Sequence, residues 1–269
     1  MYFTLSILIV GVIAFIMWFS SKKPTGVGDW SKDQAVLPWT EIRRDSLHIH
    51  NIRHCKYRAA KDYDVEHFDR IIALSDIETV DFIVEPFRGQ IGIAHTFVSF
   101  GLKDGSYLSV SIEVRKQKGE KYSAWKGLFR QFEIMYVIAD ERDVIKLRAN
   151  FRKDDVFLYP IKATSENIQK MFLSMIKRMN KLHTAPEFYN TITNTCTTEL
   201  ADHINTVTKK RVPYHWRLFI PTLVDRYAYD LGLIDNKEPF EVVKQKALIN
   251  EKAYMAHNSQ DYSKKIRGL

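Results

Sequence analysis

The sequence predicts an α+β protein with a central antiparallel sheet and packed helices, preceded by a single transmembrane helix. Three observations lead to this class. The first twenty residues carry no charged side chain, the middle of the chain alternates apolar and polar residues with a period of two, and helical spacing follows toward the C-terminus. Strands that precede helices in this way are typical of α+β domains.

The N-terminal segment is long enough to cross a bilayer. Residues 2–19 are dominated by Leu, Ile, Val, Phe and Met, and about 18 such residues span the hydrocarbon core as a helix. Trp18 stands where an interfacial aromatic residue belongs, and Lys22, Lys23 and Pro24 end the run. A cleaved signal peptide is the alternative, but the sequence lacks its basic start and its small-residue cleavage site. We expect an anchor over residues 1–20, a linker over 21–37 and one folded domain over 38–269.

The chain of 269 residues has a formal net charge of +8, which suits an anionic partner. A membrane surface is the natural candidate, because no zinc-finger spacing, aromatic RNA-binding signature or concentrated basic helix indicates nucleic acid. Lys22 and Lys23 follow the anchor, so the positive-inside rule alone would place the domain in the cytoplasm. The two cysteines, Cys55 and Cys196, form neither a disulfide framework nor a metal cluster, although one disulfide between them stays open.

The expected strands alternate in period two or form short apolar runs bounded by turn residues. They cover residues 47–57, 80–87, 94–102, 107–115, 132–139, 144–151 and 156–161, with an acidic turn at 140–143. Residues 120–130 are expected as a short helix or an apolar loop. Helices are expected over 168–182, from Cys196 onward, and over 216–234 with a break at Pro221. The polar last twenty or so residues are expected to wrap the domain as an arm.

The clearest hairpin turns at Asp104-Gly105. A three-residue loop over 103–105 places His95 opposite Glu113. A two-residue turn would set the apolar face of one strand against the polar face of the other, so the alternation favours the first register. Side chains directly opposite start about 5 Å apart at Cβ. The Glu113 carboxylate can then accept a hydrogen bond from the His95 ring and favour imidazolium, or pair instead with Arg115 on the same face.

Cys196 stands where a loop becomes a helix. Pro186 and a run of small polar residues precede it, and the possible N-caps are Thr193, Asn194 and Thr195. A thiol in the first turn feels the positive end of the helix dipole, which lowers its pKa, and backbone N–H groups there can hold an oxyanion. A cysteine taken at random is more commonly small, buried and inert. The catalytic interpretation therefore depends on the base found in the hairpin.

No metal or cofactor is predicted. The nine histidines show neither HExxH nor CxxC-like spacing, and His48 with His50 on one strand face is a weak pair. The methionines of 168–182 lie on the apolar face of the expected helix, where core packing explains them.

Several motifs form a recognisable set: the hairpin at 94–115, the segments 120–123 and 140–148, and the stretch 188–198 around Cys196. Together they resemble the Lnb-type bacterial lipoprotein N-acyltransferases. The resemblance runs from about Trp39 to the segments 231–234 and 261–267, and its motifs are specific only as a set. It implies a circularly permuted papain-like, NlpC-type fold in which histidine precedes cysteine, as His95, Glu113 and Cys196 do here.

The resemblance also implies an acyl transfer at the periplasmic face of the bacterial inner membrane, with no cofactor. Cys196 would attack an ester carbonyl of a phospholipid or diacylglyceryl group while His95 takes its proton and Glu113 orients the ring. The thioester would then acylate the α-amine of a lipoprotein's N-terminal cysteine. Acyl chains would rest on an apolar surface within 125–129, unless those residues are core.

Supporting or substrate-binding roles are expected at further polar residues: Asn51, Arg53, Ser99, Arg115, Tyr122, Asn190 and Asn194. Asn194 is either an oxyanion donor or a helix cap. The family would place the domain in the periplasm, where the substrate is made, and this outweighs the small bias of Lys22 and Lys23.

Two alternative functions stay open. A membrane-tethered cysteine peptidase or amidase of the NlpC type would use the same residues, because water and an amine attack the same acyl-enzyme. A non-enzymatic, membrane-anchored binding protein would tolerate the loss of Cys196 and His95. A disulfide between Cys55 and Cys196, or a thiol remote from His95, would exclude catalysis.

Overall fold

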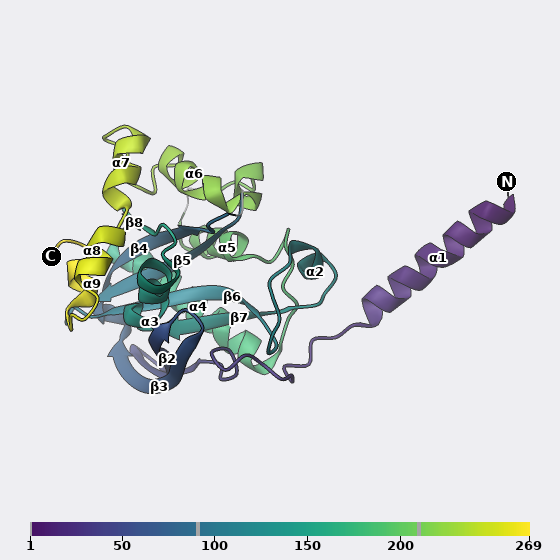
Figure 1. The fold of residues 1–269 in the computed structure, drawn as a ribbon, viewed down its shortest axis with the longest axis horizontal. Helices are drawn as coiled ribbons and strands as arrows, with labels where there is room; N and C mark the ends of the chain where they lie inside the picture. Colours follow the sequence, from purple (N-terminus) through teal and green to yellow (C-terminus); the bar gives the residue numbers. More distant parts are fainter. Residues whose placement is uncertain (1, 90–91, 209–210) are drawn as a thin grey trace.

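The computed structural model describes residues 2–89, 92–208 and 211–269. Over these residues, eight strands form one open sheet with helices on both faces, while α1 (Tyr2–Ser21) extends away from the domain (Figure 1). The strands are β1 (Trp39–Arg43), β2 (Ser46–Ala59), β3 (Asp62–Ala73), β4 (Ile77–Pro86), β5 (Ala94–Leu102), β6 (Tyr107–Arg115), β7 (Glu133–Ala139) and β8 (Phe157–Pro160). The predicted α+β class is confirmed.

The sheet is almost entirely antiparallel. Its strand order is β1-β2-β7-β6-β5-β4-β8, and β3 pairs with β2. Among the described strands, the parallel pairing is that of β2 with β7, where Arg53 lies opposite Ala139. β1 and β3 were not predicted from the sequence. β1 pairs with residues 46–50 of β2, and β3 pairs along the whole length of β2, from Ser46 to Ala59. β5 and β6 are central strands with both edges paired, which makes them a rigid support for a site.

Helices cover both faces of this sheet. After α1 they are α2 (Ala124–Leu128), α3 (Glu141–Lys146), α4 (Ser165–Thr184), α5 (Cys196–Val207), α6 (Val224–Asp230), α7 (Phe240–Ala247), α8 (Asn250–Met255) and α9 (Tyr262–Lys265). Shorter turns stand at η1 (Leu74–Asp76), η2 (Leu147–Arg152), η3 (Trp216–Phe219) and η4 (Pro221–Leu223), of which η2 is a π-helix. Residues of α4, α5 and α6 pack on one face of the sheet, and residues of α3, α8 and α9 pack on the other.

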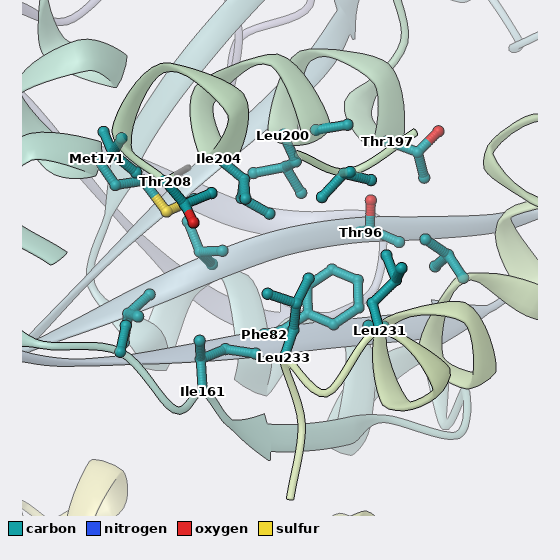
Figure 2. A pocket seen from close by; sticks show the side chains of 18 of the residues that line it. Phe82, Thr96, Ile161, Met171, Thr197, Leu200, Ile204, Thr208, Leu231 and Leu233 are labelled. Atoms are coloured by element: carbon teal, nitrogen blue, oxygen red, sulfur yellow. The ribbon is translucent and has the colours of Figure 1, made fainter. Parts of the chain in front are cut away.

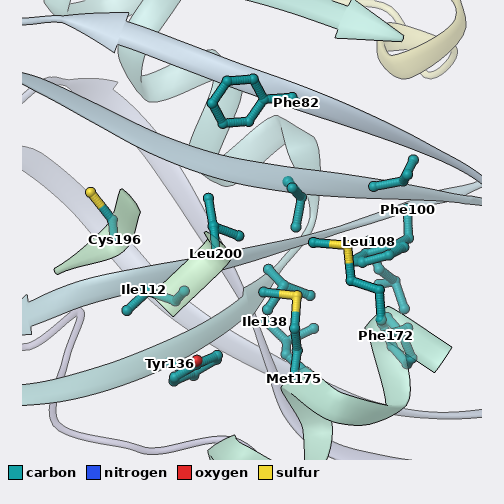
Figure 3. Close-up of a cluster of buried hydrophobic side chains, with 14 of the residues drawn as sticks. Phe82, Phe100, Leu108, Ile112, Tyr136, Ile138, Phe172, Met175, Cys196 and Leu200 are labelled. Atoms are coloured by element: carbon teal, nitrogen blue, oxygen red, sulfur yellow. The ribbon is translucent and has the colours of Figure 1, made fainter. Parts of the chain in front are cut away.

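Strand β5 is buried on both sides because helices cover each face. Val98 and Phe100 point to the α4 side, where Phe100 meets Phe172 edge to face with ring centroids 4.9 Å apart (Figure 3). Phe97 points to the opposite face and packs with residues of α3 and the C-terminal helices. Consecutive residues of β5 therefore belong to different layers of the domain.

The β5–β6 hairpin has the predicted register. Phe97 lies opposite Ser111, and Ser99 lies opposite Ser109. Gly105 in the turn has a φ of +79°, the left-handed conformation that the three-residue loop requires. The alternation of apolar residues was thus a sufficient guide to the register, because a shift by one residue would have set the apolar face of one strand against the polar face of the other.

Residues 144–151 are not the predicted strand. Asp140 is an N-cap that accepts a hydrogen bond from the N–H of Arg142 at 2.7 Å, so α3 begins where a turn between strands was expected. The helical segment continues through the π-helix η2 and ends at its C-cap, Lys153, whose φ is +58°. Acidic residues in a first helical turn are favoured by the helix dipole, and this explains why the acidic segment starts a helix.

The other expected helices are confirmed with adjusted ends. α4 contains the predicted 168–182 segment and begins after Thr164, whose side chain caps it. α5 starts at Cys196. The segment expected at 216–234 is divided into η3, η4 and α6, and Pro221 is the first residue of η4.

The linker lies against the domain instead of standing free. Backbone N–H groups of Thr25 and Gly26 donate to Glu133 at 2.9 and 2.8 Å, and Arg115 donates to carbonyls within residues 26–35. Trp30 packs under the Arg115 guanidinium, 4.2 Å from ring centre to Cζ. Within the described residues, one helix, Phe3–Ser21, is long and apolar enough to cross a membrane.

The C-terminal residues wrap the domain as predicted, and Arg267 fixes their position. Its guanidinium donates to Asp81 of β4 at 2.7 and 2.9 Å and to Glu141 of α3 at 2.6 and 2.9 Å. It also lies 3.5 Å from the centre of the Tyr107 ring. Because both carboxylates are buried, neither has bulk water as an alternative partner.

We expect Arg267→Ala to lower the free energy of unfolding by about 3–5 kcal/mol, because it leaves two buried carboxylates without their cation. Lys265 is exposed and supplies the matched control, for which Lys265→Ala should stay within about 0.5 kcal/mol. Urea denaturation of the full chain in detergent, followed by tryptophan fluorescence, measures both. A small loss of similar size in the two variants would show that Arg267 does not hold the arm.

Candidate active site

A cavity of about 270 Å³ opens at the end of the sheet where β5 begins and β6 ends. Its walls include His95 at the start of β5, Glu113 near the end of β6 and Cys196 at the start of α5. Arg148 of η2 and Tyr122 add to its polar lining. The fold therefore brings the predicted nucleophile, base and orienting carboxylate to one space.

Cys196 is the first residue of α5. The N-cap is Thr195, whose hydroxyl accepts a hydrogen bond from the N–H of Thr198. Thr193 and Asn194, the other two predicted caps, lie before it in the loop. The helix start predicted from the sequence is thus correct, and the capping residue is the one directly before the thiol.

The thiol is neutral in its buried setting. Burial raises the pKa of Cys196 and outweighs the neighbouring hydroxyl and backbone of Thr96, which lower it. The helix N-terminus was expected to favour thiolate, but loss of water at the sulfur opposes that effect more strongly. Among the described residues both cysteines are free, so the Cys55–Cys196 disulfide that would have excluded catalysis is not formed.

A chain of hydrogen bonds orients His95. Its Nε2 lies 2.7 Å from Oγ of Ser111, whose hydroxyl donates to Oε1 of Glu113 at 3.0 Å. The direct distance from Nε2 to Oε1 is 3.9 Å, which is too long for the hydrogen bond expected from the sequence. The β5–β6 ladder ends at the pair Phe97 and Ser111, so His95 and Glu113 lie just beyond its last pair, in the predicted register. Ser111 relays between ring and carboxylate, and this leaves Nδ1 for a reacting group.

Arg148 influences the protonation states of His95 and Glu113 in this hydrogen-bonded group. Its Nη2 lies 3.3 Å from Oε1 of Glu113, while Gln34 donates to Oε2 at 3.3 Å. Burial opposes ionisation of Glu113, but the Arg148 and Arg53 guanidiniums hold its pKa well below the usual range. Burial and Arg148 lower the pKa of His95 to about 3, against the opposing effect of Glu113. The resting site has a carboxylate beside a neutral imidazole, and not the imidazolium expected from the sequence.

Arg148 is itself held on three sides. Its Nε donates to Glu85, its Nη1 donates to the carbonyl of Val144 at 2.8 Å, and its Cζ lies 5.0 Å from the centre of the Phe97 ring. A guanidinium fixed in this way is a permanent positive charge in the wall of the cavity.

Cys196 and His95 approach the cavity from different sides of β5. His95 stacks on Phe97, with ring centroids 5.5 Å apart, on the α3 side. Thr96 points to the α5 side, toward the first turn that carries Cys196 and Thr197 (Figure 2). Among the described residues no hydrogen bond joins the thiol to the ring. Catalytic contacts are often long before substrate binds, so the pair is a nucleophile and a base around one empty space.

Two of the further candidates are structural residues of β2. Asn51 occupies a β-bulge with a φ of +61° and donates to the carbonyl of Leu37 at 3.1 Å. Arg53 is buried and makes two hydrogen bonds to Asp143 of α3, at 2.8 and 3.0 Å. Neither lines the cavity, although the charge of Arg53 reaches Glu113.

Two more hold other parts of the domain. Ser99 donates to Glu141 and accepts from Ser109, away from the cavity. Arg115, the predicted alternative partner of Glu113, instead binds the linker carbonyls and lies 3.7 Å from Glu133. The cation that pairs with Glu113 comes from η2.

The last three candidates lie near Cys196. Tyr122 lines the cavity, with its hydroxyl 3.4 Å from that of Tyr189. The side chain of Asn190 accepts from two backbone N–H groups of its own loop, and Asn194 donates to the carbonyl of Phe188 at 2.9 Å. Both asparagines shape the loop that leads into α5, so Asn194 is neither the helix cap nor a free oxyanion donor.

Sequence reasoning missed Ser111, Arg148 and Gln34. A signal for Ser111 existed, because the hairpin register places it on the same face as His95 and Glu113. Arg148 gave none, since its segment was interpreted as a strand. Gln34 belongs to the linker, whose contact with β6 depends on the folded structure.

Fold and cavity together define a class: an α+β domain with a buried thiol, an imidazole and a carboxylate around one cavity, carried on one apolar helix. Residues 64–222 match the family model described as the Lnb N-terminal periplasmic domain. This is more than half of the chain, which therefore belongs to the Lnb family. The family and the N-terminal helix fit a single-pass membrane protein with a periplasmic domain. Comparisons with curated proteins and with solved structures found no significant match.

We expect alkylation of Cys196 by iodoacetamide to accelerate about tenfold per pH unit from about pH 6 to 9, because the thiolate reacts and burial raises the pKa of this thiol. A thiolate–imidazolium pair would instead give a level rate across this range. Peptide mass spectrometry separates Cys196 from Cys55, whose pKa is raised to about 12 and which serves as the slow control. A level profile at Cys196 would contradict the neutral pair.

Proposed function

We propose that this protein is a lipoprotein N-acyltransferase with a circularly permuted papain-like fold, anchored in the bacterial inner membrane. It moves a fatty acyl chain from a lipid ester to the α-amine of a lipoprotein's N-terminal cysteine through a thioester on Cys196. The observation that carries the proposal is that Cys196 lines one cavity, here called the thiol cavity, which shares Thr197 and Leu218 with a second, almost wholly apolar cavity. His95 and Glu113 line the thiol cavity as well, and Ser111 is hydrogen-bonded to both of them.

The apolar cavity has a volume of about 150 Å³ and lies between the sheet and helices α4, α5 and α6 (Figure 2). Thr197 and Leu218 line both cavities, directly beside the thiol. Most of the lining is aliphatic or aromatic, including Val80, Phe82, Val98, Ile161, Met171, Leu200, Ile204, Leu231 and Leu233. A dry apolar cavity of this size takes a benzene-sized group, and Met171 is flexible enough to make room for more. Burying about six methylenes there contributes about 5 kcal/mol to acyl-chain binding.

The α2 segment, which lines the thiol cavity at Ala124, lies against the end of the anchor. The ring of Phe129, just after α2, is 6.3 Å from that of Phe15 in α1, and the Phe129 carbonyl accepts a hydrogen bond from Lys22. Trp125 of α2 is 73% exposed, and Ala124 of the same helix lines the cavity. This arrangement supports an acyl donor that stays in the membrane, with the exposed indole at the lipid surface.

The chemistry needs one thiol and one base. Sγ of Cys196 attacks the ester carbonyl carbon while its proton passes to Nδ1 of His95, whose Nε2–H is held by Ser111 and Glu113. The C–O bond breaks, the proton goes to the departing alcohol, and a thioester remains. An amine attacks the thioester and gives a proton to His95. The C–S bond then breaks, and Cys196 regains its proton. An ester and an amine have become an alcohol and an amide.

The neutral resting state suits this sequence. An imidazole with a pKa of about 3 is unprotonated at neutral pH, so its nitrogen is free to receive the thiol proton, although the burial that lowers this pKa also makes it a weak base. The Cys196 side chain is almost fully buried, which protects a thioester from water while an amine is delivered. If water reaches the thioester first, the same residues give the hydrolase that the sequence left as an alternative.

Replacing the nucleophile or the base tests the proposal. We expect Cys196→Ser and His95→Ala each to reduce N-acylation by at least about 10³-fold, as loss of a catalytic nucleophile or base commonly does. Mass spectrometry of lipoprotein N-termini from cells that carry each variant measures the transfer. Cys55→Ala is the control, since Cys55 is an equally buried thiol outside the cavity, and its N-acylation should match the unchanged chain.

Circular dichroism melts show whether each variant folds. N-acylation that continues in a folded Cys196→Ser variant would contradict the enzyme and favour the binding-protein alternative. Free fatty acid released without N-acylation would indicate a hydrolase.

The apolar cavity makes a separate prediction about chain length. Ala201 of α5 is buried and lines this cavity, so Ala201→Phe should fill part of it. We expect the variant to form the Cys196 thioester from p-nitrophenyl palmitate at least about tenfold more slowly, with the rate for p-nitrophenyl acetate unchanged. The acetate ester is the internal control, because a two-carbon chain does not need the cavity. Equal effects on both esters would remove the cavity from the acyl-binding role.

A further inference from the structure

We propose that Glu41, His48 and His50 bind a divalent transition-metal ion, for which Zn²⁺ is the best fit. The three residues lie on β1 and β2 at one edge of the sheet. Strands β7 and β6 separate β2 from β5, so this site is distinct from the thiol cavity and does not depend on the proposed acyl transfer.

The β1–β2 pairing assembles the three ligands. Glu41 lies directly opposite His48, and His50 stands two residues further along the same face of β2. One carboxylate oxygen and one ring nitrogen from each histidine all lie within 4.8 Å of one another. Around a tetrahedral Zn²⁺ with bonds of about 2.0–2.1 Å, ligand atoms are roughly 3.3 Å apart, so small side-chain rotations complete the site. The sequence analysis found a weak histidine pair because its third ligand comes from a strand that was not predicted.

His50 has one ring nitrogen held by a carboxylate and the other available to a metal ion. Its Nδ1 lies 2.7 Å from Oδ2 of Asp69, the kind of carboxylate contact that orients metal-binding histidines. Its Nε2 is buried and has no hydrogen-bond partner among the described atoms. The nearest carboxylate oxygen, Oε1 of Glu41, is 3.7 Å away, which is too far for a hydrogen bond. A buried nitrogen lone pair that faces a carboxylate across a gap is a place for a cation.

The surroundings hold the His50 ring in place. The bulge at Asn51 turns its N–H toward Oδ1 of Asp69 at 2.9 Å, and this keeps the carboxylate beside the ring. Trp39 stacks on His50 with ring centroids 4.1 Å apart. The orientation of Nε2 is therefore fixed by groups behind it, as in carboxylate–histidine–metal arrangements.

Arg43 is the competing cation at Glu41. Its Nη2 lies 2.6 Å from Oε2, but the Arg43 side chain is 80% exposed and the contact leaves Oε1 available. Two imidazoles and one carboxylate favour Zn²⁺ over Mg²⁺ or Ca²⁺, which prefer oxygen ligands, and leave one position for water. All three ligands precede residue 64, where the family match begins, so the site is a feature of this chain's own N-terminal strands. Bound metal would fasten the edge strand β1 to β2.

Zinc binding by the full, untagged chain in detergent tests the site. After dialysis against a chelator, isothermal titration with ZnCl₂ should show one ion bound per chain. His50→Ala and His48→Ala should each lower the affinity by more than about 100-fold, and Asp69→Asn by about 10- to 100-fold, because it removes only the outer carboxylate. His67→Ala is the matched control, since His67 lies on the neighbouring strand β3 outside the cluster, and it should bind as the unchanged chain does.

Substitution with Co²⁺ gives a second readout, because a four-coordinate site produces intense visible absorption. That absorption should appear in the unchanged chain and in His67→Ala and be lost in His50→Ala. If His50→Ala fails to fold by circular dichroism, Glu41→Gln on the surface side of the cluster replaces it. No stoichiometric binding by the folded chain, or binding retained in both ligand variants, would overturn the proposal.

Discussion

The site depends on the contacts that the buried guanidinium of Arg148 makes with its neighbours. It donates to Glu85 on β4, pairs with Glu113 on β6 and covers Phe97 on β5, so one side chain from η2 contacts three neighbouring strands. Removing one partner of a buried ion pair leaves an uncompensated charge, so such a cluster holds its members together even where its net stabilisation is small. The position of η2, the ionised state of Glu113 and the neutral state of His95 all follow from this arrangement.

Burial, rather than the helix dipole, determines the resting chemistry. A thiol in a first helical turn is usually activated by the dipole, but here loss of solvent keeps Cys196 protonated. A neutral thiol resists oxidation, which matters for a free cysteine in an oxidising compartment such as the periplasm. In the proposed reaction, Cys196 would become reactive only when a substrate carbonyl enters and the thiol proton can pass to His95.

Much of the fold could be predicted because the patterns were strong. Core burial on both faces of β5 fixed the hairpin register, and the helix at Cys196 follows from its polar cap and apolar spacing. The strand predicted over 144–151 was wrong, because acidic residues such as those before Val144 occur both in turns between strands and in the first turn of a helix. Partners far apart in the sequence could not be predicted. The ion pair of Glu113 with Arg148 and the pairing of β1 with β2 depend on tertiary packing that no local pattern encodes.

The contacts of Phe129 with Phe15 and Lys22 join helix α2, which lines the thiol cavity, to the end of α1, and so set the distance between the two. The linker cannot relax this distance, because residues 25–35 are hydrogen-bonded along β6 and β7. In the proposed reaction, lipid donors and lipoproteins anchored in the same leaflet would reach the thiol cavity by lateral diffusion in two dimensions. The turnover rate would then depend on the number of lipid-linked substrates per area of membrane. Adding aqueous buffer to the membranes would leave this rate unchanged.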